Sequence, residues 1–355
     1  MGNPKQAFVT GGTGLVGRAV VTRLLERGIH VTLLLRGGAE ERRKDALDAL
    51  RATAEDSGRT LAIVHGDLAQ PRMGLGAVEL SALSDAGHCF HIAALYDIEA
   101  DAERLAQTNV DGTRHLLEAL RDASFDGRLH HVSSVAVAGD YENTFTESMF
   151  DEGQGFPHAY HRSKYDSEKL VRESGLDYRI YRPSGVVGDS KTGAIDKIDG
   201  VYFSFDAMRK LAHAVPRWVR LPLPRIRGAF NLVPVDYVAD ALLHIAFSDS
   251  DARVFHLVDP TPPSLTKMSS ILLSAAGGPS VGPALDLEKL PGAKKTLGMV
   301  SMLPSIQELR DGALADLGLP LGSLGALNIK ARYEDSNTQA ALSGSGITCP
   351  PLRSY

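Results

Sequence analysis

The chain has 355 residues, 43% hydrophobic and 23% charged, so it is long enough to bury a sizeable core and shows no compositional sign of disorder. Its net charge of −5 argues against a nucleic-acid partner, because such proteins usually carry a basic face. The two cysteines, Cys89 and Cys349, form neither a disulfide framework nor a metal-binding pattern, and we expect no bound metal. Because the chain holds no apolar stretch of the roughly 18 to 20 residues that a bilayer requires, we expect a cytoplasmic protein without a transmembrane segment.

Short apolar runs alternate with amphipathic patterns through the first half of the chain. In Leu15–Arg27, for example, Val16, Val20 and Leu24 recur every four residues, which predicts a helix with one apolar face. Continuous apolar strands separated by helices indicate a parallel sheet covered on both faces. The sequence therefore predicts an α/β fold, a Rossmann-type doubly wound parallel sheet. The expected strands are Ala7–Thr10, His30–Arg36, Leu61–Gly66, His88–Ala94, Leu129–Ser134 and Tyr178–Gly188, and the other expected helices are Ala39–Glu55 and Glu103–Leu120.

The pattern becomes irregular from Lys191 to Ala229 and resumes at Asn231–Ala246, with a late strand at Val254–Asp259. Prolines 260, 262 and 263 then mark a linker. We predict a dinucleotide-binding Rossmann domain of residues 1–190 plus about 231–259. A smaller, discontinuous substrate-binding lobe of about 191–230 plus 260–335 and a C-terminal tail of 336–355 complete the expected organisation.

A glycine-rich turn, TGGTGLVG at Thr10–Gly17, lies between the first strand and the first helix. Glycine allows the dihedral angles of such a turn and lets the backbone approach a pyrophosphate, which the amides of the helix N-terminus also attract. Glycine-rich packing of strand against helix is the alternative. We predict dinucleotide binding by Gly11, Thr13, Gly14, Leu15, Val16 and Gly17.

The second strand ends at Leu35-Arg36, where a site for NAD would usually carry an acidic residue. A guanidinium instead suits the 2′-phosphate of NADPH, and Arg42, Arg43 and Lys44 follow closely. The alternative is that Arg36 is only a solvated strand end. We predict NADPH as the cofactor.

Two further strand ends are expected to contact the cofactor. Asp67, followed by Leu68, can accept a hydrogen bond from the adenine amino group or cap the next helix. Ala93 leaves room for the cofactor backbone. Asn109 is more easily explained as a structural tie between helix and sheet.

Tyr160 and Lys164 lie four residues apart on a predicted helix and therefore on one face. A neighbouring cation lowers the pKa of a phenol, which would make it a better proton shuttle. Ser134 ends the fifth strand, and the carboxyl ends of parallel strands meet at the cofactor crevice. We predict that its hydroxyl holds a substrate carbonyl; a turn serine is the alternative.

Across roughly residues 6 to 260, the chain resembles the extended short-chain dehydrogenases/reductases. This resemblance implies that Ser134, Tyr160 and Lys164 are catalytic, that Lys164 also binds the nicotinamide ribose, and that Pro183 lines the nicotinamide. Ala138 departs from the tyrosine of many sugar-nucleotide members, which weakens an epimerase interpretation. The matching segments are TGGTGLVG at Thr10–Gly17, GDL at Gly66–Leu68, NVDGT at Asn109–Thr113, VSSVAVAG at Val132–Gly139, YHRSK at Tyr160–Lys164 and RPSGVVG at Arg182–Gly188.

Other segments are similar to the reductase module of bacterial fatty acyl-CoA reductases and thioester reductases. They are DLAQPRMGLG at Asp67–Gly76, HIAALYD at His91–Asp97, TGAIDKIDGVYFSF at Thr192–Phe205, NLVPVDYVADAL at Asn231–Leu242 and SNTQAALSGSGITCPPL at Ser336–Leu352. The resemblance implies NADPH-dependent reduction of a long-chain fatty aldehyde, or of an acyl thioester on CoA or a carrier, toward the alcohol. It also implies that the chain can be one module of a longer protein with a second reductase module.

The stretch Leu211–Phe230 combines apolar residues with arginines such as Arg217 and Arg220, which suits an acyl chain beside a phosphate. A packed segment with solvated arginines explains it equally well. Two other functions stay open: action on a smaller ketone, aldehyde or nucleotide sugar, and cofactor sensing without turnover. The intact Ser134, Tyr160 and Lys164 argue against the sensor.

Overall fold

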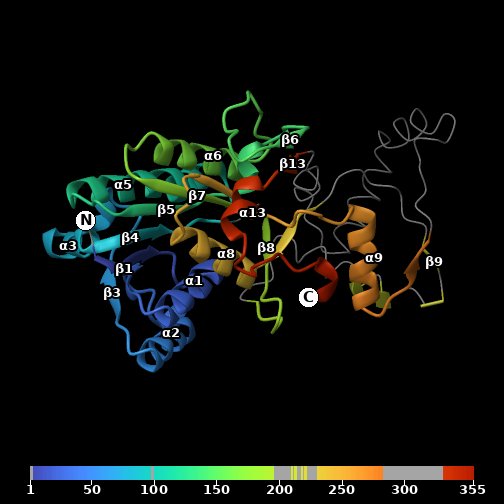
Figure 1. Ribbon diagram of the computed structural model, residues 1–355, viewed down its shortest axis with the longest axis horizontal. Helices are drawn as coiled ribbons and strands as arrows, with labels where there is room; N and C mark the ends of the chain where they lie inside the picture. Colours follow the sequence, from blue (N-terminus) through green and yellow to red (C-terminus); the bar gives the residue numbers. More distant parts are fainter. Residues whose placement is uncertain are drawn as a thin grey trace.

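The computed structural model describes residues 3–96, 100–195, 209–210, 212–213, 217–218, 220–221, 230–282 and 331–355. Its centre is a seven-stranded sheet in the order β11-β7-β5-β4-β1-β2-β3, and every neighbouring pair is parallel (Figure 1). This confirms the predicted α/β class with a doubly wound parallel sheet. The strands are β1 (Asn3–Thr10), β2 (His30–Leu35), β3 (Leu61–His65), β4 (Ala86–His91), β5 (Arg128–Val132), β7 (Tyr178–Pro183) and β11 (Val254–Leu257).

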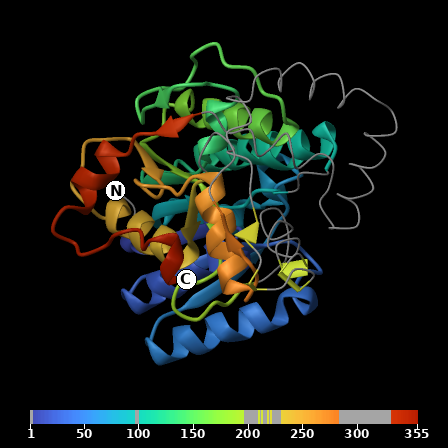
Figure 2. The ribbon, with the colours of Figure 1, turned by 90° about the vertical axis from the view of Figure 1, so that its right-hand side faces the viewer.

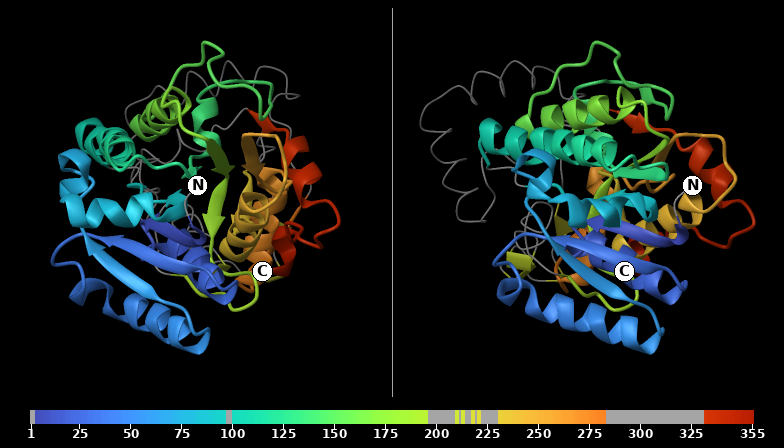
Figure 3. Two further views of the ribbon diagram at one scale, coloured as in Figure 1. Left: turned by 60° about the vertical axis from the view of Figure 1, so that its left-hand side comes forward. Right: turned by 90° about the vertical axis from the view of Figure 1, so that its left-hand side faces the viewer.

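Helices cover both faces of this sheet (Figure 3). One layer holds α1 (Leu15–Glu26), α2 (Lys44–Asp56) and α8 (Val235–Ala246), and the other holds α3 (Ala77–Ser84), α5 (Gly112–Asp122) and α6 (Ala159–Arg172). Short 3-10 turns lie at η1 (Glu41–Arg43), η2 (Pro71–Gly74), η4 (Val135–Ala138) and η6 (Leu352–Ser354). The crossover helices thus leave the carboxyl ends of the strands as one shared edge.

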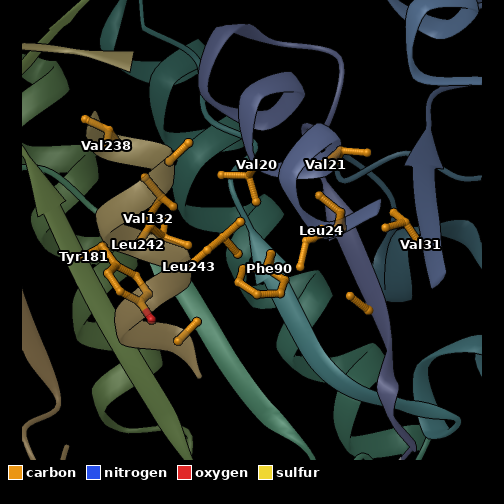
Figure 4. Packing of buried hydrophobic residues seen from close by; sticks show 14 of the residues in the cluster. Val20, Val21, Leu24, Val31, Phe90, Val132, Tyr181, Val238, Leu242 and Leu243 are labelled. Carbon is orange, nitrogen blue, oxygen red and sulfur yellow. The ribbon is translucent and has the colours of Figure 1, made fainter. Parts of the chain in front are cut away.

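The larger apolar core lies between the sheet and the layer of α1 and α8 (Figure 4). Val20 and Leu24 of α1, four residues apart, are fully buried against Phe90 of β4. Leu242 and Leu243 of α8 close the same cluster. Burying each such side chain contributes about 1.5 to 3 kcal/mol, so this layer fixes the strands that position the site.

Two predicted elements differ from the structure. The helix expected at 103–120 is interrupted: α4 (Ala102–Leu105) and α5 are joined by a π-helical turn, η3 (Ala106–Asp111). The strand expected at 178–188 is two strands. After β7, β8 (Gly185–Val187) leaves the main sheet and pairs in parallel with β10 (Leu232–Pro234), because the carbonyl of Asn231 accepts from the Gly185 amide and its side chain accepts from the Ser184 hydroxyl.

The segment 331–355 packs onto the Rossmann sheet, as Figure 2 shows for the red ribbon. β13 (Arg332–Tyr333) pairs with β6 (Thr144–Phe145), and α13 (Ser336–Leu342) contacts α8 and β11. The buried Glu147 carboxylate accepts from the backbone N–H of His256, Asn337 and Thr338 at 2.7, 2.6 and 3.2 Å.

Of the predicted substrate lobe, the structure describes α9 (Leu265–Ala275) and the short pair β9 (Arg220–Leu221) and β12 (Ser280–Val281). Much of 191–230 and 260–335 lies outside the described residues. The proposed domain boundaries therefore stay a prediction.

Candidate active site

The glycine turn brings the carboxyl ends of β1 and β4 into close contact. Gly11 has a φ of +73°, and a Cβ there would lie 2.5 Å from the backbone nitrogen of Ala93. A Cβ on Gly17 would collide with the carbonyl of Gly11. Gly14 is the N-cap of α1 and no side chain caps this helix. The turn therefore offers uncapped helix amides next to a backbone that side chains cannot crowd, which fits a pyrophosphate.

A basic pocket of about 340 Å³ lies beside this turn. Its cationic side chains are Arg18 of α1 and Arg42, Arg43 and Lys44 of the segment after β2; Thr13, Glu41, Asp45 and Ala46 complete the lining. Arg36 is exposed directly after β2 and does not line the pocket. Arg18 was not among the predicted residues, although its position directly after Gly17 in the first helical turn indicates that it lies near the phosphates.

The other predicted cofactor residues lie at strand ends. The Asp67 carboxylate accepts a hydrogen bond from the amide of Ala69 at 3.0 Å and so closes its own turn. Asp67 does not cap α3, because the N-cap of that helix is Gly76. The carbonyl of Leu68 is hydrogen-bonded by His115 at 2.7 Å, which ties this turn to α5. Pro183 is buried at the end of β7.

Ser134, Tyr160 and Lys164 meet at the carboxyl end of β5. Ser134 follows the strand, accepts from the amide of Ala136 at 3.1 Å, and is hydrogen-bonded to Tyr160. Lys164, one turn further along α6, is buried, and its Nζ donates to the carbonyl of Val132 at 3.0 Å. The structure therefore brings together the three residues that the sequence placed 30 residues apart (134 to 164).

Burial controls the ionisation of this cluster. It raises the pKa of Tyr160, as does nearby Tyr96, while the hydrogen bond from Ser134 opposes the shift. Burial also lowers the pKa of Lys164 to about 8, although Glu168 opposes this. The prediction that Lys164 lowers the pKa of Tyr160 is wrong for this arrangement, because the ammonium is directed to the Val132 carbonyl and the desolvation of the phenol dominates.

A fully buried ion pair between Glu168 and Arg182 lies next to the cluster. Glu168, one turn after Lys164, accepts from Arg182 Nε and Nη2 at 3.0 and 2.6 Å, and from the hydroxyl of Ser133 at 2.6 Å. Arg182 also donates to the carbonyl of Met149 at 3.0 Å. Although burial raises it, the pKa of Glu168 is held at about 2 by Arg182. The sequence analysis did not identify this pair.

The structure combines a Rossmann-type sheet, a glycine turn open to a pyrophosphate and a serine–tyrosine–lysine cluster. Together with the family match, these features define an NAD(P)-dependent oxidoreductase of the extended short-chain dehydrogenase/reductase type. The model of an NAD-binding family described as "Male sterility protein" matches residues 9–242, and the chain belongs to this family.

Relatives include large biosynthetic enzymes. The chain is 26% identical to a linear gramicidin synthase of Brevibacillus parabrevis over 99% of its own length and 7% of that protein. It is 30% identical to L-2-aminoadipate reductase of Schizosaccharomyces pombe over 69% of its length and 18% of that protein. The chain thus spans a small part of these relatives.

Among solved structures, the terminal R domain of the myxalamid PKS-NRPS pathway superimposes with a TM-score of 0.77 and 25% identity, covering 100% of this chain and 88% of that one. The reductase domain of a Mycobacterium tuberculosis nonribosomal peptide synthetase gives a TM-score of 0.69 at 21% identity, covering 99% and 89%, and shows a shared fold. The predicted resemblance to extended short-chain dehydrogenases/reductases and to thioester reductases is confirmed.

No helix in the described ranges is long and apolar enough to cross a membrane.

Proposed function

We propose that the chain is an NADPH-dependent reductase of an acyl group, held as a thioester on a carrier or CoA or presented as a long-chain fatty aldehyde, and that it works toward the alcohol. The observation that carries the proposal is the Ser134–Tyr160–Lys164 cluster at the same sheet edge as the glycine turn. Relatives named as peptide synthetases and reductase domains support a carrier-bound substrate. The much greater length of those relatives is consistent with a chain that works as one module beside a carrier or a second reductase module.

The cofactor residues divide along the crevice. The turn residues Gly11, Thr13, Gly14, Leu15, Val16 and Gly17 would hold the pyrophosphate, Asp67 and Leu68 the adenine, Ala93 and Pro183 the nicotinamide, and Lys164 its ribose. The nicotinamide supplies the hydride when bound.

In the proposed reaction the hydroxyls of Ser134 and Tyr160 hydrogen-bond the substrate carbonyl oxygen, on which negative charge grows as the carbon is reduced. Tyr160 then donates its proton to that oxygen. The phenol is protonated at neutral pH before the reaction, as a proton donor requires. A thioester reduced in this way releases a thiol and an aldehyde, and a second reduction of the aldehyde gives the alcohol.

The preference for NADPH over NADH is supported by charge. Arg36 replaces the usual acidic residue after β2, and the basic pocket of Arg18, Arg42, Arg43 and Lys44 lies alongside. A 2′-phosphate would meet several cations there.

The acyl chain was predicted from the stretch 211–230 and from the resemblance. Most of the predicted apolar stretch at 211–230 lies outside the described residues. Within it, Trp218 is 84% exposed, and Arg217 donates to the carbonyl of Gly277 at 2.6 Å. This contact favours a structural role for Arg217, so the fatty acyl substrate depends chiefly on the resemblance.

Replacing Tyr160 by phenylalanine tests the proposal. We expect kcat for NADPH oxidation with decanal and decanoyl-CoA to fall by about 10² to 10⁴, because general acid catalysis is lost. NADPH affinity, measured by fluorescence, should be unchanged. Tyr165→Phe is the matched control. Tyr165 lies on the same helix as Tyr160 but outside the cluster, and its phenol interacts with Asp151. A Tyr160→Phe variant with more than about a tenth of the wild-type kcat would contradict the acid role.

A further inference from the structure

A second tyrosine lies against the proposed proton donor. Tyr96 follows β4 by five residues, and its ring centroid is 5.1 Å from that of Tyr160 with the planes at 86°. Edge-to-face geometry of this kind is one that aromatic pairs prefer. None of the roles assigned above uses Tyr96.

Asn109 of the π-helical turn holds the backbone of Leu95, the residue before Tyr96. Asn109 is buried, accepts from the amide of Leu95 at 2.7 Å and donates to the carbonyl of the same residue at 3.1 Å. Both backbone groups of Leu95 are therefore held by one side chain. The prediction that Asn109 is a structural tie is confirmed.

The same amide reaches the helix that carries Tyr160. Asn109 Nδ2 donates to the hydroxyl of Ser163 at 2.9 Å, and that hydroxyl donates to the carbonyl of Tyr160 at 2.9 Å. Each donor in this network has its own acceptor. Asn109 thus links the backbone of Leu95, directly before Tyr96, to the helical turn that carries Tyr160, and the two rings pair beside this link.

Tyr96 is nevertheless 43% exposed, whereas Tyr160 is partly buried. Part of the Tyr96 ring therefore covers Tyr160 and part stays open at the edge of the sheet where Ser134 and Tyr160 meet. A partly exposed aromatic ring that packs on Tyr160 offers apolar surface beside the position of the reacting carbonyl.

We propose that Tyr96 determines substrate specificity: its ring is the wall against which the alkyl chain next to the reacting carbonyl packs. The residue then favours carbonyl compounds with an extended apolar chain over short ones. This inference rests on the proposed function. It assigns the contact to the ring, so the phenol hydroxyl of Tyr96 is not required.

The test compares Tyr96→Ala and Tyr96→Phe with the wild type, using decanal and propanal as substrates and NADPH as reductant. For Tyr96→Ala we expect kcat/KM to fall about tenfold for decanal and clearly less for propanal, because losing an aromatic contact has about that effect. Tyr96→Phe keeps the ring, so the ratio of kcat/KM for decanal to kcat/KM for propanal should stay at the wild-type value. Phe247→Ala is the matched control, since Phe247 is 39% exposed and packs edge-to-face on His88 away from the site.

Equal losses for the two aldehydes, or no loss for decanal, would overturn the inference while leaving the proposed function intact. A wild-type chain that reduces neither of these aldehydes nor decanoyl-CoA would instead refute the proposed function. The inference would then be decided by the affinity of the NADP⁺-loaded protein for decanamide, measured by calorimetry. If Tyr96→Ala binds decanamide tenfold more weakly than the wild type, the result supports the proposed role of the Tyr96 ring, and unchanged affinity rejects that role.

Discussion

Replacing Glu168 by glutamine is expected to remove a large share of the free energy of unfolding. Its side chain is fully buried, and its two oxygens accept four hydrogen bonds: two from Arg182, one from Arg172 at 2.9 Å and one from Ser133. The amide of glutamine keeps one acceptor but turns the other into a donor that faces cations. Arg182 would then be buried without its counter-ion.

The magnitude follows from the burial of the pair. Removing one partner of a buried ion pair costs about 3 to 5 kcal/mol. The lowered pKa of Glu168, about 2 beside the Arg182 guanidinium, has the same sign: the folded chain favours the carboxylate. Because the pKa of Glu168 is lower in the folded chain, this stability is fully present above about pH 4.5 and is lost as the pH falls toward 2.

Urea unfolding at neutral pH measures the difference directly. The control is Glu173→Gln, just beyond the end of the same helix, where an exposed partner, Lys169, lies 3.9 Å away and a change within about 0.5 kcal/mol is expected. A loss below about 1 kcal/mol for Glu168→Gln would refute the reasoning, because Arg182 would then be satisfied without the carboxylate.

Three further predictions concern cofactor and pH. Arg36→Asp should weaken NADPH binding at least about tenfold while leaving NADH binding similar or improved, since a charge-assisted bond is replaced by repulsion; equal changes for both cofactors would remove Arg36 from the 2′-phosphate site. Gly11→Ala should weaken cofactor binding far more than Gly38→Ala. Both glycines have a φ near +70°, but only at Gly11 would the added Cβ meet backbone atoms, those of Ala93. Equal NADPH affinities for the two variants would contradict this. Lys164 donates to the Val132 carbonyl and, in the proposed function, to the nicotinamide ribose, and the ammonium is the stronger donor for both. With its pKa lowered to about 8, kcat/KM for decanal should therefore be constant below about pH 8 and fall above it. A decline that begins only near pH 10, as for an ordinary lysine, would show that burial does not act on the working enzyme.

The sheet could be predicted because each βα unit carries its own signal. The apolar runs and the four-residue spacing of Val16, Val20 and Leu24 are local, and right-handed crossovers then leave few topologies. What could not be predicted depends on distant partners. β8 leaves the main sheet because Asn231, over 40 residues later, supplies its partners. Within the π-helical turn at 106–111, Asn109 hydrogen-bonds Leu95 in the loop after β4, a contact that the periodicity of the sequence does not indicate.

The site shows the same division. Ser134, Tyr160 and Lys164 could be grouped because the strand end and the helix face were both readable in the sequence. Glu168 looked like one more polar residue of an amphipathic helix, and nothing local distinguishes it from Glu173. The direction of the Lys164 ammonium, and hence the pKa of Tyr160, depends on the depth of burial and on the Val132 carbonyl, which only the packed structure reveals.

The contacts of Glu147 also say something about the order of assembly. Thr338, whose hydroxyl donates to this carboxylate at 2.8 Å, lies 191 positions further along the chain. Closing so long a loop costs conformational entropy before any contact repays it, whereas each βα unit closes over a few tens of residues. The segment of β13 and α13 should therefore dock after the sheet has formed, onto a surface that already exists. By the same reasoning its amides should exchange with solvent through local opening, at a lower free energy than those of β1 and β4 in the centre of the sheet.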